Sequence, residues 1–246
     1  MVPVLIVLVL IVISGGMVVK QFMAEKYRPT EDFMNYADAY GLAEDEYTIL
    51  LNGAIHEKHG KIADGRVYLP MTGVTKEINS RFYWDKSEKV LIYSLPDAVL
   101  KFTADKTEYV EQAWDGSVER SEDYPVLKKI GKERYIDAEY VKSHTRADMG
   151  IYDDPRRIAI RTQWGEKDVV TARRETPIRY KGGIKSEVLR NAQDGETFVV
   201  LDPYDDWTQI CTEDGFLGWI STEDTTPVET KALAEADFDE PEYTSI

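Results

Sequence analysis

The pattern that most constrains this chain is a strand-helix-hairpin unit that occurs twice. The first copy spans residues 64–94 and the second spans residues 131–161. In register, Tyr68 aligns with Tyr135 and Val74 with Val141 at an offset of 67 residues. One inserted residue then aligns three further pairs, which are Asp85 with Asp153, Val90 with Ile158 and Ile92 with Ile160. A period this long indicates duplication inside one domain, because solenoid repeats are shorter.

Local composition predicts the elements of each copy. The expected order in the first copy is a strand over 67–70, a short helix over 72–79, a strand over 81–84, a polar turn over 85–89 and a closing strand over 90–93. The second copy carries its turn at 153–155. We therefore predict an α+β fold that is mainly β, with a duplicated domain.

Three stretches of the first copy carry a resemblance to a known family. They are DGRVYLP from Asp64, RFYWD from Arg81 and KVLIY from Lys89. This pattern resembles the extracellular domain that is named after the N-terminal domain of copper amine oxidases and occurs on many Gram-positive surface proteins. The closest form is the one that precedes a family 18 glycoside hydrolase in clostridial proteins. The resemblance covers roughly residues 45–163. Such domains are not expected to bind copper or oxidise amines, so it implies no metal and no cofactor.

An uncharged apolar run at residues 2–19 predicts a transmembrane helix. It is close to the roughly 20 residues that cross the hydrocarbon core, and a buried globular helix is rarely apolar on every face. We expect an uncleaved signal anchor over 1–24, with a cleaved signal peptide as the main alternative. Lys20, Lys26 and Arg28 follow the run, so a positive-inside count alone would place the rest of the chain inside. The resemblance to an extracellular family instead implies extracytoplasmic domains, on a polar stalk over 25–44 with one short helix around 32–40.

After residue 168 the pattern changes to short strands separated by polar turns, which is typical of a small β-barrel. The expected strands are 169–171, 176–179, 187–189, 196–201, 207–212 and 218–220. The stretches DGE from Asp194, DWTQI from Asp206 and GWI from Gly218 resemble a bacterial SH3 domain over 168–224. The polyproline-binding signature of eukaryotic SH3 domains is absent. Residues 225–246 are acidic and without apolar periodicity, which predicts a linker.

The SH3 resemblance implies a ligand groove beside aromatic side chains. The candidates by position are Tyr180, Tyr204, Trp207 and Trp219, and the implied ligand is cell-wall peptide. The alternative is that the two tryptophans belong to the barrel core and the domain is a spacer. Cys211 is expected to point into the barrel as a small apolar group.

Charge narrows the class of partner. The net charge of −15 argues against nucleic acid as a partner, because its phosphates require lysine and arginine. Residues 168–224 contain six basic and twelve acidic side chains, a net charge of −6, which disfavours anionic teichoic acids and tolerates a peptide with free amines. The SH3 resemblance implies peptidoglycan, or another glycan or peptide of the cell wall, as the partner, besides the membrane.

Several other residues are candidates for metal binding or for stacking on sugars. His56 and His59 form H-E-K-H, which lacks the spacing of a zinc-protease helix and predicts a solvated hairpin, and His144 is expected at the surface. Aromatic packing is favoured over sugar stacking for Tyr93, Trp114 and Tyr124. In the triplet 82–84, either Tyr83 alone or both its neighbours can be exposed, because side chains alternate along a strand.

The sequence predicts a non-catalytic chain. The D-x-x-D-x-D-x-E run of family 18 hydrolases is absent, and the acidic pairs at 153–154 and 205–206 lie in turns, where Asp is favoured for backbone bonding. We predict a membrane-tethered extracytoplasmic region that targets or positions a cell-wall glycoside hydrolase. Residues 240–246 resemble the approach to a family 18 barrel, so one alternative is a hydrolase whose catalytic domain lies beyond Ile246. The other alternative is a structural spacer or protein-interaction stalk.

Overall fold

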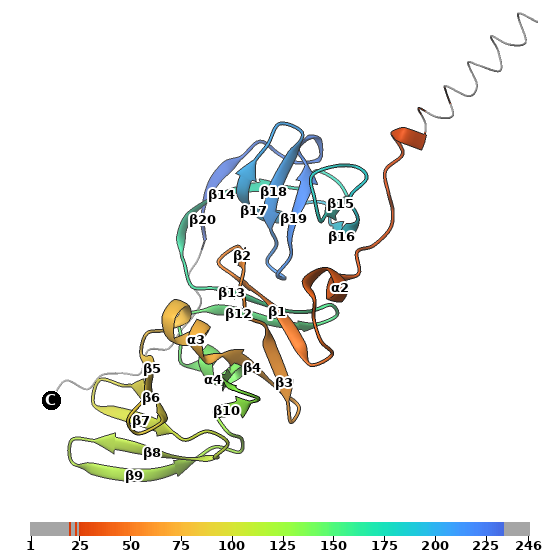
Figure 1. The fold of residues 1–246 in the computed structure, drawn as a ribbon. Coiled ribbons are helices and arrows are strands. Elements are labelled where there is room, and N and C mark those ends of the chain that lie inside the picture. Colours follow the sequence, from red (N-terminus) through yellow and green to blue (C-terminus); the bar gives the residue numbers. More distant parts are fainter. Residues whose placement is uncertain (1–19, 21–22, 24, 234–246) are drawn as a thin grey trace, which may run out of the picture.

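The computed structural model describes residues 20, 23 and 25–233, and it arranges them in three β-sheets (Figure 1). Strands account for 50% of the chain and helices for 12%, which confirms the prediction of a mainly β fold. In Figure 1 the eight-stranded sheet lies between the seven-stranded sheet at one end and the five-stranded sheet at the other. Among these residues no helix has the length and apolarity to cross a membrane. The apolar run at 2–19 lies outside the described residues.

Residues 46–161 form the part that we call the repeat module, and its described strands lie in two sheets. The strands are β1 (Glu46–Leu51), β2 (Ala54–Ile55), β3 (Gly60–Ala63), β4 (Arg66–Pro70), β5 (Phe82–Asp85), β6 (Val90–Ser94), β7 (Ala98–Phe102), β8 (Glu108–Ala113), β9 (Gly116–Ser121), β10 (Leu127–Ile130), β11 (Glu133–Asp137), β12 (Asp148–Asp153) and β13 (Arg156–Arg161). The helices are α3 (Met71–Gly73), which continues as the π-helical segment η1 (Val74–Ile78), and α4 (Ala138–Ser143). Each predicted element of the first copy is present to within one or two residues.

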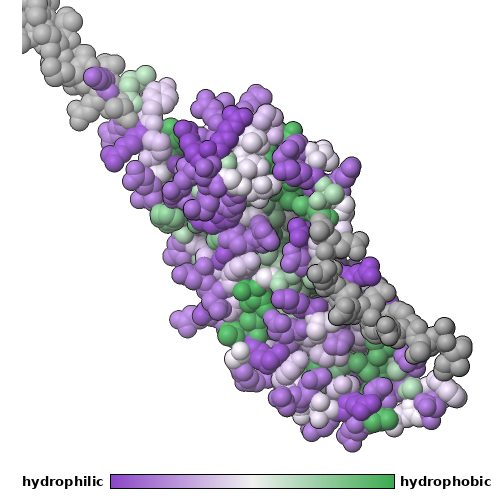
Figure 2. All heavy atoms as spheres, turned by 180° about the vertical axis from the view of Figure 1, so that it is seen from behind, coloured by the Kyte–Doolittle hydropathy of each residue, from purple (hydrophilic) through white to green (hydrophobic). Residues whose placement is uncertain are grey.

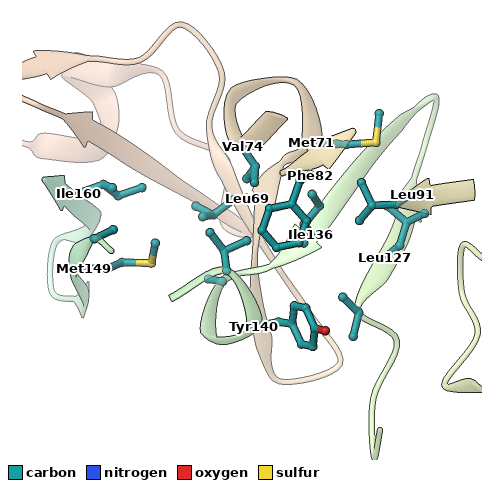
Figure 3. Packing of buried hydrophobic residues seen from close by; sticks show 14 of the residues in the cluster. Leu69, Met71, Val74, Phe82, Leu91, Leu127, Ile136, Tyr140, Met149 and Ile160 are labelled. Carbon is teal, nitrogen blue, oxygen red and sulfur yellow. The ribbon is translucent and has the colours of Figure 1, made fainter. Parts of the chain in front are cut away.

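The two copies meet at equivalent positions. Strands β4 and β11 pair antiparallel, and Leu69 lies opposite Ile136, which is 67 residues later in the chain. Both side chains are fully buried. A local twofold axis that relates the two copies therefore passes between these two residues. Figure 3 shows Leu69, Val74, Phe82 and Ile136 gathered in the hydrophobic core between the copies.

The repeat is one strand longer than the sequence indicates. Lys61 pairs with Tyr68 between β3 and β4, and Lys128 pairs with Tyr135 between β10 and β11, so both partners shift by 67 residues. The turn between β3 and β4 consists of Asp64 and Gly65, both with positive φ, as a two-residue hairpin loop requires. Each copy thus begins with a hairpin before its helix.

The inserted residue expected in the second copy is not present. Phe82 pairs with Tyr93 in the first hairpin, and Met149 pairs with Ile160 in the second, so the offset remains 67 throughout. This register also matches Leu91 with Ile158, and both are fully buried. The sequence alignment was wrong by one residue because β6 is buried at three consecutive positions, so side-chain alternation does not define its core face.

The copies differ in what lies beside their last strands. Strand β6 continues through a short turn into β7, and β8 and β9 extend this sheet. After β13 the chain leaves the module, and β1 pairs parallel with β13 instead. The second copy is thereby joined to the N-terminal strand of its module and stands next to the C-terminal part of the chain.

Residues 165–233 form the C-terminal module, whose strands build one sheet around a second hydrophobic core. The strands are β14 (Gly165–Thr171), β15 (Thr176–Arg179), β16 (Val188–Ala192), β17 (Thr197–Pro203), β18 (Trp207–Cys211), β19 (Leu217–Ser221) and β20 (Glu229–Leu233), with the 3-10 helix η2 (Thr222–Asp224) before β20. All six strands expected here are present. The predicted linker after residue 225 was wrong over its first part, because β20 pairs with β14 over five residues.

The predicted stalk is packed against the C-terminal module. Phe33 forms a bridge with Val188, and the N–H of Thr30 donates a hydrogen bond to the carbonyl of Ile184 at 2.8 Å. The predicted short helix is α2 (Tyr36–Tyr40), which begins after the capping residue Asn35. Residues 30–40 therefore belong to the folded structure and do not extend freely as a stalk.

Candidate functional site

The two tryptophans lie on the outer face of the C-terminal sheet. Trp207 pairs with Ser221 and Trp219 pairs with Gln209 between β18 and β19, so both indoles are on the same face. Ile210 and Ile220 point to the opposite face and are fully buried in the core, which does not include either indole. The alternative that placed Trp207 and Trp219 in the barrel core was therefore wrong. Both side chains are partly exposed.

Tyr204 joins the two tryptophans in a surface that we call the aromatic surface. Its side chain is 66% exposed, and its ring centroid lies 6.2 Å from that of Trp219 at an interplanar angle of 70°. Gly182 lies beneath the two indoles, because an added Cβ there would be 3.3 Å from both Trp207 Cβ and Trp219 Cε3. The backbone of the 180–187 loop therefore borders the aromatic surface, and a larger residue at 182 would displace the indoles.

The loop that carries Tyr204 is held by hydrogen bonds to Trp207 and to Thr222 of η2. The N–H of Tyr204 donates to the carbonyl of Trp207 at 3.0 Å, and the N–H of Thr222 donates to the carbonyl of Asp206 at 3.0 Å. The hydroxyl of Thr222 donates to the carbonyl of Tyr204 at 3.3 Å. The exposed ring is thus presented by a defined backbone, so a ligand meets a surface that is already ordered.

Tyr180 is not part of this surface. Its ring packs edge-on against Tyr40 of α2 at 6.3 Å, and Lys181 lies over it at 5.5 Å. Burial raises the pKa of the Tyr40 hydroxyl above its usual range. Of the four predicted site residues, three come together and Tyr180 instead attaches the N-terminal segment to the module. This contact was not predictable, since it depends on where residues 30–40 fold back.

Cys211 was expected to point into the barrel, and it does not. It follows Trp207 and Gln209 on the outer face of β18 and lines a cavity of about 520 Å³ between the two modules. Burial raises the pKa of its thiol to about 11. Strands β1, β12 and β13 of the repeat module and β14, β17 and β18 of the C-terminal module contribute to the lining. The sequence contains no signal for this cavity, because neither module forms it alone.

A buried arginine connects the two modules beside this cavity. Arg157 on β13 is 5% exposed, and its Nε donates to the carbonyl of Asp214 at 2.6 Å while Nη2 lies 3.1 Å from the Asp214 carboxylate. The same carboxylate contacts Arg190 at 2.9 Å. The guanidinium of Arg157 also stacks on Phe216 at 4.1 Å, and Phe216 packs edge-on against Tyr36 of α2. The modules and the N-terminal segment therefore share one interface.

The three histidines have separate environments. His56 Nε2 lies 3.3 Å from the Glu77 carboxylate, and His59 Nδ1 lies 3.1 Å from that of Glu46. Within the described part of the chain, no group of three or more His, Cys, Asp or Glu residues could hold a metal ion. His144 is not the surface residue that we expected, because its ring stacks on Tyr140 at 3.9 Å. Burial lowers its pKa.

Of the other aromatic candidates, Tyr83 and Trp114 line one surface pocket of the repeat module, and the rest lie apart from it. Tyr93 is buried in the core, Tyr124 lies against Arg66 at 3.5 Å, and Trp114 is 87% exposed at the turn between β8 and β9. In the triplet after Arg81, Phe82 is fully buried and Tyr83 is 44% exposed, which confirms the alternative in which Tyr83 alone faces solvent.

Searches of protein-family models, curated proteins and solved structures find no match to this chain. The two family resemblances are therefore carried by the motifs alone. What the chain does must be argued from the aromatic surface and from the interface between its modules.

Proposed function

We propose that this chain is a non-catalytic, membrane-tethered extracytoplasmic region that targets a cell-wall glycoside hydrolase, and that the aromatic surface binds wall peptide. The observation that supports the proposal most directly is the outward position of Trp207 and Trp219 beside the exposed ring of Tyr204. Large aromatic side chains outside a core supply much binding area at little cost in conformational entropy. The cell-envelope location in this proposal is inferred from the motif resemblances.

The charge around the aromatic surface supports a ligand with free amines. Asp205 and Asp206 are exposed next to Tyr204 and Trp207, in a module with an excess of acidic residues. Figure 2 shows hydrophilic residues over most of one face of the molecule, with hydrophobic areas that are small and separate. An acidic aromatic surface favours a peptide that carries ammonium groups over an anionic polymer.

A pelleting assay with purified peptidoglycan tests this proposal. We expect the full chain in mild detergent to sediment with peptidoglycan, and Tyr204→Ala to weaken this binding about fivefold, for a loss of about 1 kcal/mol of aromatic contact. Tyr204 is the best residue to change because its side chain is mostly exposed and its substitution leaves the core intact. The matched control is Trp114→Ala, which removes an exposed aromatic ring from the other module.

Two outcomes would count against the proposal. Equal binding by the Tyr204→Ala variant and the parent chain would remove the aromatic surface from the site. No binding to any wall fraction would favour the spacer alternative. Reading the gene beyond the codon for Ile246 separately tests the hydrolase: an open frame with the D-x-x-D-x-D-x-E run would supply the enzyme that this region positions, and a stop codon would leave a free-standing surface protein.

A further inference from the structure

The cavity between the modules has the dimensions of a ligand site. Its volume of about 520 Å³ lies within the range of about 300–1,000 Å³ that is usual for small-molecule sites. One wall comes from the repeat module and the other from the C-terminal module. It is separate from the aromatic surface, because Trp207 and Cys211 lie four residues apart on β18, or about 13 Å at the rise of a strand.

The walls of the cavity are mostly apolar. Leu50 and Ile160 line it from the repeat module, and Val169 and Val199 line it from the C-terminal module. Cys211 adds a neutral thiol, since burial raises its pKa to about 11. These side chains offer a surface for an apolar group of up to moderate size.

Among the described residues, the polar lining contains one charge of each sign whose side chain makes no hydrogen bond or ion pair. Arg161 and Asp148 neutralise one another at 2.7 Å. Lys167 and Glu213 also line the cavity, and among the described residues the side chain of neither makes a hydrogen bond or an ion pair. Lys167 is half-buried and Glu213 is exposed, so the two charges are available to a ligand that places a carboxylate toward Lys167 and an ammonium toward Glu213.

We infer that the cavity between the modules binds a short zwitterionic peptide with apolar side chains, held by Lys167 and Glu213 at its two charged ends. The apolar walls receive the side chains, and the ion pair of Arg161 with Asp148 lies in the lining without taking up either free charge. This site is independent of the aromatic surface and does not rest on the proposed function. Both modules contribute to the lining of this site, so the site exists only where the two modules pack together.

The test uses the dipeptide L-leucyl-L-leucine and the full chain in mild detergent. Because Cys211 is the only cysteine in the sequence, the rate of its labelling by a maleimide at mildly alkaline pH reports access to the cavity. We expect the dipeptide to slow labelling in a saturable way and to give a matching isotherm by calorimetry. The blocked analogue N-acetyl-leucyl-leucine amide should bind at least about tenfold more weakly, because it has lost both charged contacts.

Two variants test the assigned charges. Lys167→Met and Glu213→Gln should each weaken dipeptide binding at least about tenfold. Lys132→Met is the matched control, since Lys132 is an exposed lysine in the repeat module that does not line the cavity. Tyr204→Ala should leave dipeptide binding unchanged, so failure of the aromatic surface and failure of this site are distinguishable.

The inference is overturned if the dipeptide neither slows labelling nor produces heat up to its solubility limit. It is also overturned if the blocked analogue binds as well as the dipeptide, because the free charges would then have no role. Cys211→Phe should fill the cavity and abolish binding. Should that variant fail to fold, the two charge variants still decide the question.

Discussion

Replacing Arg157 by methionine should destabilise the protein more than any other single change of charge at the module interface. The methionine keeps an apolar stem on Phe216 but removes the guanidinium, which contacts the Asp214 carboxylate at 3.1 Å and the carbonyl oxygens of Asp154 and Pro155 at 3.1 and 2.8 Å. The change therefore leaves several carbonyl groups without this donor, and it removes one of the two guanidinium groups that contact the Asp214 carboxylate.

The magnitude follows from burial. Removing one partner of a buried ion pair costs about 3–5 kcal/mol, because the other charge remains without compensation. The Asp214 side chain is 29% exposed and keeps its contact with Arg190 at 2.9 Å. We therefore expect the lower end of the range, a loss of about 3 kcal/mol in the free energy of unfolding.

Urea unfolding followed by tryptophan fluorescence measures this loss. The control is Arg156→Met, since Arg156 is the neighbour on β13 and its side chain points to the opposite face of the strand. If Arg157→Met costs less than about 1 kcal/mol, or no more than its control, the arginine is not what holds the interface together.

Two further predictions concern the repeat module. Leu69→Ala and Ile136→Ala should each cost about 3 kcal/mol in the free energy of unfolding, and the double variant should cost less than the sum, because the two side chains meet at the same place in the core; strict additivity in urea unfolding would contradict the proposed pairing. For Glu46, burial alone would raise the pKa, but hydrogen bonds with the Ala43 amide, His59 and Lys61 outweigh it and lower the pKa to about 2. Since the folded-state pKa lies below the unfolded value, this carboxylate stabilises the protein above about pH 4.5, and the contribution is lost as the pH falls toward about 2. Glu46→Gln should lower the midpoint of thermal unfolding at neutral pH and have little effect near pH 2, and an equal effect at both pH values would disprove this account.

The candidate site was predicted in part. Trp207, Trp219 and Tyr204 were candidates by their positions in the SH3 resemblance, and the structure brings these three side chains together on one face; that they bind a ligand stays a prediction. Tyr180 lies apart from them, because it follows the end of β15 and its ring packs against Tyr40 of α2, a contact that no local pattern in the sequence indicates. The prediction that the Cys211 side chain points into the barrel was also wrong. The repeat module packs on the outer face of β18, so an apolar side chain there is buried without facing the barrel core.

The sequence by itself determined the elements of this protein. Strands, short helices and turns follow from side-chain alternation, from Gly and Asp at positions of positive φ, and from β-branched and aromatic content, all of which act over a few residues. It also determined that one unit occurs twice. Only the tertiary structure decided the register of the copies, the pairing of β1 with β13, the docking of residues 30–40, the addition of β20 and the cavity between the modules. The physical reason is that these features depend on which surfaces meet, and contacts between residues far apart in the chain leave no local pattern in it.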